Sequence, residues 1–179
     1  MRVSRAVVVC LMWCALVSAA SAFDRQPPIE VGFSPDAGAE ALSIRALASA
    51  QKTIRLAAYS FTSKPIAQAL IAARRRGVDV RCTLDKSNTT SKSGRAAANL
   101  LTNAGIDVRI DTRHPIHHNK YIVIDNQTVE TGSFNYSKAA AHANAENVIV
   151  IWKNRELAAS YLDNWKLHWD HAQRWQSTY

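Results

Sequence analysis

The stretch His117–Asn135 reads HHNKYIVIDNQTVETGSFN and carries the clearest structural signal in the chain. Apolar and polar residues alternate in NKYIVID and again in VETGSFN, as in β-strands with one buried face. The residues between the two runs, Asp125–Thr128, favour a turn. The stretch therefore predicts a β-hairpin.

Four polar side chains are expected on one face of this hairpin. With a two-residue loop at Asn126–Gln127, His118 faces Asn135 and Lys120 faces Ser133 across the two strands. Residues two apart on a strand point the same way, so this face carries donors and one nucleophile but no carboxylate. Such a face suits a phosphate, and a histidine that attacks phosphorus forms a covalent phosphohistidine.

Strand and helix patterns alternate along the rest of the chain. Strand patterns occur in IEVGFS, TIRLAAYSF, VDVRCTLD, IDVRI and ENVIVIW, and helical patterns occur at residues 38–50, 65–76, 95–103 and 155–171. The alternation, with its short connections, predicts an α/β fold in which one mixed β-sheet is flanked by helices in a single domain. The polar segment KSNTTSKSG, residues 86–94, follows a strand end and is interpreted either as a ligand loop or as a flexible linker.

The last predicted helix carries an apolar stripe that favours core packing. Stacking of Trp165, Trp169 and Trp175 on nucleic-acid bases is the alternative, but these tryptophans lack interleaved basic residues. The stripe consists of Leu157, Tyr161, Leu162, Trp165 and Trp169.

The first 22 residues have the pattern of a secretory signal peptide. Arg2 and Arg5 precede the apolar run 6–17, which is shorter than the roughly 20 residues that span a bilayer, and Ala20–Ala22 provides a cleavage site. We expect residues 23–179 to form the mature domain, periplasmic or secreted, without stable membrane insertion.

The mature chain is basic and contains one cysteine. Removal of residues 1–22 leaves 157 residues, with 20 basic and 14 acidic side chains, and a charge of about +6. The positive charge is typical of proteins with anionic partners. Because Cys82 is the only cysteine of the mature chain, an internal disulfide and a zinc–cysteine site are excluded. Cys82 alternates with polar neighbours in a strand pattern and is expected to be a core residue.

The hairpin pattern resembles the single HKD motif of the phospholipase D superfamily in its GSxN form. The matching positions are His118, Lys120, Asp125, Gly132, Ser133 and Asn135. The segment YSFTSKPIAQAL, the length and the signal peptide add a similarity to the small secreted Nuc-type bacterial endonucleases. This resemblance extends over essentially the whole mature chain, and it implies a phospholipase D-like α-β-α sandwich.

The resemblance also implies a role for each motif residue. His118 is the nucleophile or acid, Lys120 and Asn135 bind the phosphate, and Ser133 is a supporting donor. Glu146 matches the acidic residue that orients the histidine, which fixes its tautomer and stabilises the charged ring. Of the remaining motif positions, Asp125 and Gly132 are expected to be structural.

The chemistry requires a second histidine, because one attacks phosphorus while another protonates the departing oxygen. His117 points to the opposite face from His118, and His114 is at best a substrate contact. The family solves this with a homodimer that shares one active site. No cofactor is expected, since no carboxylate or cysteine completes a metal site with the histidines at 114, 117 and 118 or with those at 168 and 171.

The resemblance therefore implies a dimeric endonuclease that cleaves DNA non-specifically, with RNA left open as a substrate. A phospholipase is the enzymatic alternative, since positive surfaces also attract anionic bilayers. A catalytically inactive nucleic-acid-binding module is the other alternative. The basic residues that would follow a phosphate backbone, or simply be solvated, are Arg74–Arg76, Lys86, Lys92, Arg95 and Arg113.

Overall fold

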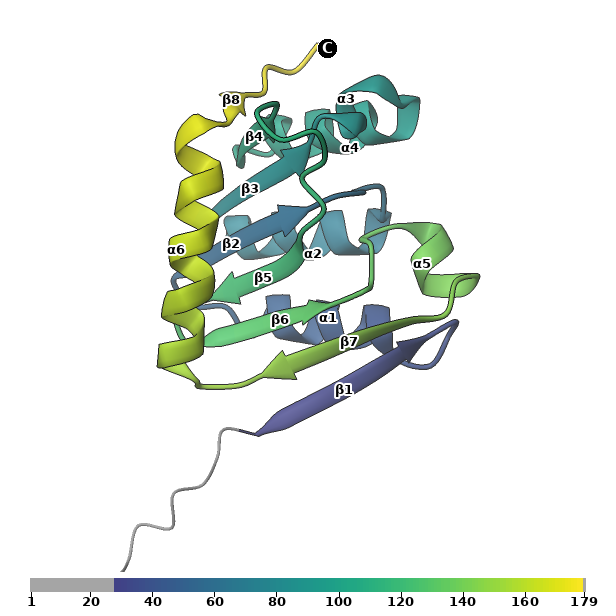
Figure 1. The fold of residues 1–179 in the computed structure, drawn as a ribbon, viewed down its shortest axis with the longest axis vertical. Helices are drawn as coiled ribbons and strands as arrows, with labels where there is room; N and C mark the ends of the chain where they lie inside the picture. Colours follow the sequence, from purple (N-terminus) through teal and green to yellow (C-terminus); the bar gives the residue numbers. More distant parts are fainter. Residues whose placement is uncertain (1–27, 179) are drawn as a thin grey trace, which may run out of the picture.

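The computed structural model describes residues 28–178, which form a β-sheet with helices on both faces (Figure 1). The predicted signal peptide, residues 1–22, lies outside the described residues. The strands are β1 (Ile29–Ser34), β2 (Thr53–Ala58), β3 (Asp79–Asp85), β4 (Asp107–Asp111), β5 (Lys120–Ile124), β6 (Thr128–Gly132), β7 (Glu146–Ile151) and β8 (Gln173–Arg174). The helices are α1 (Ala39–Ala48), α2 (Lys64–Arg75), α3 (Ser87–Thr90), α4 (Lys92–Asn103), α5 (Lys138–His142) and α6 (Arg155–His171).

The eight strands form one mixed sheet in the order β1-β7-β6-β5-β2-β3-β4-β8. β2, β3 and β4 are parallel to one another, and the remaining neighbours are antiparallel. This confirms the predicted α/β fold with a mixed sheet. The short edge strand β8 had no sequence signal.

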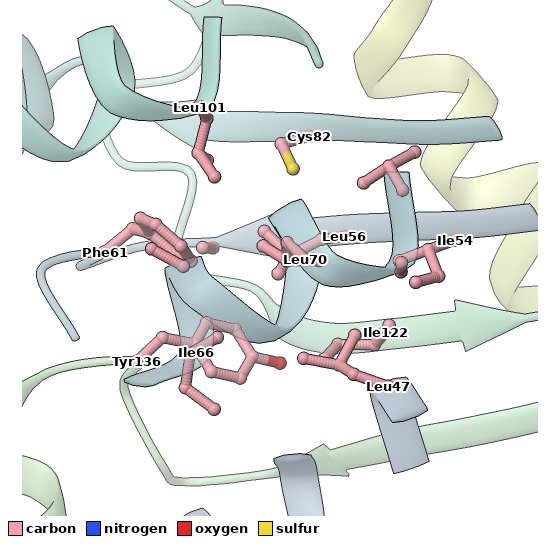
Figure 2. Close-up of a cluster of buried hydrophobic side chains, with 14 of the residues drawn as sticks. Leu47, Ile54, Leu56, Phe61, Ile66, Leu70, Cys82, Leu101, Ile122 and Tyr136 are labelled. Atoms are coloured by element: carbon pink, nitrogen blue, oxygen red, sulfur yellow. The ribbon is translucent and has the colours of Figure 1, made fainter. Parts of the chain in front are cut away.

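Two hydrophobic cores lie on opposite faces of the sheet. Helices α1, α2 and α4 bury one face, where Leu47, Leu56, Leu70 and Leu101 are fully enclosed (Figure 2). Cys82 is also fully buried in this core, as predicted, and burial raises the pKa of its thiol. Helix α6 covers the other face.

The stripe on α6 packs as predicted. Trp165 and Trp169 stack with ring centroids 4.7 Å apart in the second core, and the indole N–H of Trp165 donates to the Leu56 carbonyl at 3.0 Å. The Asn154 side chain caps the helix by accepting a hydrogen bond from the Leu157 N–H at 3.0 Å. Among residues 28–178, no helix combines the length and apolar character needed to cross a bilayer.

The polar segment 86–94 is more regular than the sequence indicates. Most of it is helical, and α4 begins at Lys92 rather than at residue 95. Ser91 caps α4 by accepting a hydrogen bond from the Gly94 N–H at 3.0 Å. Buried Asn88 accepts from the Phe61 N–H at 2.9 Å and donates to the Tyr59 carbonyl at 2.6 Å, so the flexible-linker interpretation is wrong.

The hairpin is present, but the predicted register is wrong by one residue. Its loop contains three residues, 125–127, and Tyr121 pairs with Thr131. Asp125 causes the difference in register. It adopts a positive φ of 51°, and the following asparagine has a φ of 54°. Its carboxylate accepts hydrogen bonds from three backbone N–H groups, those of residues 51, 52 and 53, at 2.7–2.9 Å. These contacts hold Asp125 outside the ladder, so every facing pair shifts.

Candidate active site

The motif residues meet where several strands begin or end, along the edge of the sheet formed by the strand ends. β5 begins at Lys120, the neighbouring β6 ends at Gly132, and β7 begins at Glu146. β2 is antiparallel to β5, and its last residue, Ala58, pairs with Lys120. The carboxyl ends of β2, β3 and β4 therefore lie at this same edge, where α/β sheets usually bind ligands.

His118 and Lys120 lie in direct contact at this edge. The Lys120 ammonium nitrogen is 3.3 Å from both ring nitrogens of His118 and donates to the His118 carbonyl at 2.8 Å. The Tyr59 ring supports both side chains, with its centroid 4.6 Å from that of His118 and 5.2 Å from the ammonium. Burial lowers the pKa of Lys120, and the charge of Glu146 partly opposes this shift. The exposed imidazole therefore lies beside a cation.

Ser133 is held against β7 by a close backbone approach at Gly132. The Ser133 hydroxyl accepts a hydrogen bond from the Asn147 N–H at 3.0 Å, and its own N–H donates to the Asn147 carbonyl at 3.1 Å. A Cβ at Gly132 would lie 2.1 Å from that carbonyl oxygen. Glycine is thus required for the position of Ser133.

The side chains of Asn135 and Glu146 make few hydrogen bonds within the described chain. The carboxamide oxygen of Asn135 is buried and, within residues 28–178, has no hydrogen-bond partner. The Glu146 carboxylate accepts from the Asn144 side chain at 3.0 Å. In the described chain it makes no hydrogen bond to His118, so its role in orienting the imidazole stays a prediction.

A pocket of about 410 Å³ opens beside the motif. His118 and Lys120 line one side, and α6 supplies Tyr161 and Asn164. The Asn164 carboxamide oxygen accepts a hydrogen bond from the Tyr121 hydroxyl at 2.7 Å. His118 and Lys120 thus face solvent through this hollow.

Two buried carboxylates anchor the loop that carries His118. This loop, residues 112–119, leaves β4 and crosses the ends of β3 and β2 to reach β5. Asp85 accepts a hydrogen bond from the His117 N–H at 2.7 Å and one from the Ser87 N–H at 2.8 Å. Asp111 accepts from the Arg113 N–H at 3.0 Å. The catalytic candidate is therefore positioned by residues at the ends of two parallel strands.

The comparisons with known proteins agree with this geometry. The family model described as "Cardiolipin synthase, PLD-like domain" matches residues 43–169, a span that contains all the motif residues described above. The chain belongs to the phospholipase D family. Nuc, a phospholipase D family member from Salmonella typhimurium, is 45% identical, with a TM-score of 0.83 over 85% of this chain and 100% of that chain.

Two curated relatives in the phospholipase D family have names that refer to lipids. "Phospholipase D" of Rickettsia prowazekii is 45% identical over 133 residues, which cover 74% of this chain and 63% of the relative. "Mitochondrial cardiolipin hydrolase" of Canis lupus familiaris is 29% identical over 158 residues, or 87% of this chain and 61% of the relative. The chain thus spans less than two thirds of the length of these two relatives.

In this member of the phospholipase D family, a histidine cluster lies next to the motif. Asp111, His114, His168 and His171 place one potential ligand atom each within 4.8 Å of one another. The sequence interpretation that no carboxylate completes the histidine sets is therefore wrong. Asp111 is only three residues from His114, but it is 57 residues from His168, and only the packing of α6 brings them together.

His117 belongs to the same region and does not point toward the substrate side. Its side chain is fully buried, with Nδ1 3.2 Å from Asp111. Burial and the neighbouring His168 lower the pKa of His117 to about 4, although Asp111 and Asp85 partly oppose the shift. Burial by itself would raise the pKa of Asp111, but hydrogen bonds from the surrounding histidines hold it below its usual value.

Proposed function

We propose that the protein is a homodimeric phosphodiesterase that cleaves DNA endonucleolytically, without a catalytic metal ion, through a phosphohistidine at His118. The observation that carries this proposal is the contact between the exposed His118 imidazole and the Lys120 ammonium at the open sheet edge. A phosphodiester placed there would meet a nucleophile and a counter-charge together.

The other motif residues complete an anion site around this pair. The ammonium of Lys120 supplies a point charge, and Ser133 and Asn135 supply directed hydrogen bonds to phosphate oxygens. Ser133 is pinned to β7 through Asn147 and is exposed. Such fixed donors stabilise the charge that develops on the oxygens in the transition state.

The need for a second histidine supports a dimer. The neighbouring His117 is enclosed against Asp111 with both ring nitrogens buried, so it cannot reach the leaving group from the opposite side. A second copy of the chain, related by a two-fold axis, brings another His118 to the same phosphate. A single protomer would thus hold half of the catalytic groups.

The reaction then divides into two displacements at phosphorus. A ring nitrogen of one His118 attacks, a P–N bond forms, and the P–O bond to the leaving group breaks as the second His118 protonates that oxygen. The second His118 next removes a proton from water, the water oxygen bonds to phosphorus, and the P–N bond breaks. Both histidines return to their starting states.

The distribution of basic side chains favours a nucleic acid over a lipid headgroup. Lys86 follows β3, Lys92 begins α4 and Arg113 follows β4, and all three are exposed near the edge that holds the motif. Ammonium and guanidinium groups spaced along one edge suit a repeating phosphate backbone. By contrast, Arg76 donates to the carbonyls of residues 47, 48 and 50 and serves the fold.

Plasmid nicking in excess EDTA tests the proposal. The wild-type chain is expected to nick, His118→Ala to lose at least about 10³-fold in rate, and the exposed control His142→Ala to match wild type. Vesicles of phosphatidylcholine and of cardiolipin form the parallel arms. Nicking only with added Mg²⁺ or Mn²⁺, undiminished nicking by His118→Ala, or lipid cleavage without nicking would each contradict the proposal.

A further inference from the structure

Four imidazoles converge on one buried carboxylate outside the HKD motif. Asp111 is fully buried at the end of β4, and Nδ1 of His114 and Nδ1 of His168 lie 2.9 and 3.0 Å from its Oδ2. Nε2 of His171 lies 3.2 Å from its Oδ1, and Nδ1 of His117 lies 3.2 Å from Oδ2. Two backbone N–H groups also donate to Oδ1, so six groups surround a carboxylate that has about four acceptor sites.

The ring nitrogens are not all used by the fold. His117 is 1% exposed; its Nδ1 faces Asp111 at 3.2 Å without hydrogen-bond geometry, and its Nε2 has no hydrogen-bond partner within residues 28–178. Nε2 of His171 is also buried without one, although it points at Asp111. A buried polar atom without a hydrogen-bond partner is costly, and a cation shared by the rings would remove that cost at Nε2 of His171.

We propose that Asp111, His114, His168 and His171 bind one Zn²⁺ ion, with His117 as a buried neighbour of the site. Three imidazoles and one carboxylate are a donor set that zinc takes in tetrahedral coordination, at about 2.0–2.2 Å. Imidazole ligands select a transition ion of this type over Mg²⁺, which prefers oxygen ligands. With ligand atoms already within 4.8 Å of one another, small side-chain rotations complete the site.

The ion has a structural role distinct from the nuclease chemistry. His168 and His171 belong to the last turn of α6, whereas Asp111 ends β4 and His114 lies in the loop that leads to His118. One ion would therefore fasten α6 to that loop across the sheet edge. The Asn119 carboxamide nitrogen lies 3.3 Å from Nε2 of His168 and connects the cluster with the residue next to His118.

Calorimetric titration of the mature chain with ZnCl2 tests the site. The chain is prepared without a polyhistidine tag and stripped with EDTA, and the chelator is then removed. We expect one Zn²⁺ per chain with a dissociation constant in the micromolar range or below, and no saturable heat with MgCl2. Bound zinc should raise the melting temperature by about 5 °C. X-ray absorption should show only nitrogen and oxygen ligands.

Variants separate this site from other histidines. His171→Ala and His114→Ala each remove one ligand and should weaken zinc binding at least about 10-fold, with folding checked by circular dichroism. His142→Ala and His118→Ala should bind zinc as the wild type does. Zinc affinity is measured without DNA, so it tests this site even if the nuclease proposal fails. Absence of saturable zinc binding, or equal affinity in the His171→Ala, His114→Ala and wild-type chains, would overturn the proposal.

Discussion

Removal of the Asp85 carboxylate tests how the fold positions His118. Asp85 is 2% exposed and accepts charge-assisted hydrogen bonds from the His117 N–H at 2.7 Å and the Ser87 N–H at 2.8 Å. Each such bond contributes about 1.5–3 kcal/mol. Asp85→Ala is therefore expected to lower the free energy of unfolding by about 3–5 kcal/mol, and Asp85→Asn, which keeps one acceptor, by about half as much.

The effect on catalysis should exceed the effect on binding. His118 directly follows the anchored His117, and a shift of about 1 Å at a reacting group costs about 100-fold in rate. For chains that remain folded at 25 °C, we expect kcat for plasmid nicking to fall by about that factor in Asp85→Ala, with a smaller loss in Asp85→Asn. KM for DNA should change little, because no DNA-binding group is removed.

Urea unfolding and nicking kinetics measure both quantities, with Asp163→Asn as the matched control. Asp163 is exposed on α6 and lies 3.5 Å from Lys166, so its removal should change stability by less than about 0.5 kcal/mol and leave nicking intact. If Asp85→Ala nicks DNA at the wild-type rate, or if it is no less stable than the control, the loop is not held by this carboxylate and the reasoning is refuted.

Three further substitutions test other parts of the structure. Gly132→Ala places a Cβ 2.1 Å from the Asn147 carbonyl oxygen, so it should separate β6 from β7, cost about 1–3 kcal/mol in urea unfolding and reduce nicking; unchanged values would contradict the close approach. Asp125→Ala removes an acceptor shared by three backbone N–H groups and should cost about 2–4 kcal/mol, with an unshifted urea midpoint as the contrary result. Burial raises the pKa of Glu130 to about 7 despite hydrogen bonds from Tyr136 and Ser43. The folded chain therefore holds this proton more tightly than the unfolded chain. The protonated carboxyl thus contributes stability that is present below about pH 4.5 and is lost as the pH rises to 7. Melting curves across this range should show a smaller decline for Glu130→Gln than for the wild type, and equal slopes would refute the shift.

The sequence was sufficient where the structure depends on local patterns. The alternation in the hairpin and the apolar stripe of α6 both lie within the elements they specify. The predicted helix 155–171 has the bounds found for α6. The mixed sheet follows from the alternation of these elements.

The features that the sequence did not predict depend on contacts between residues that are distant in the chain. The hairpin register depends on Asp125, whose carboxylate binds backbone groups 72–74 residues earlier in the chain. The segment 86–94 is ordered by buried Asn88, which contacts the chain 27 residues earlier. The histidine cluster forms only because the end of β4 lies next to the last turn of α6, and no local sequence pattern predicts that contact.

Mixing wild-type chains with His118→Ala chains tests the shared active site most directly. If each site needs one His118 from each of two copies, only wild-type pairs are active after subunit exchange. With equal amounts of both chains at a fixed total concentration, nicking in EDTA should fall to about a quarter of the wild-type rate. A His142→Ala mixture should remain at the full rate. A fall to only about half would show that each chain acts alone and would contradict the account.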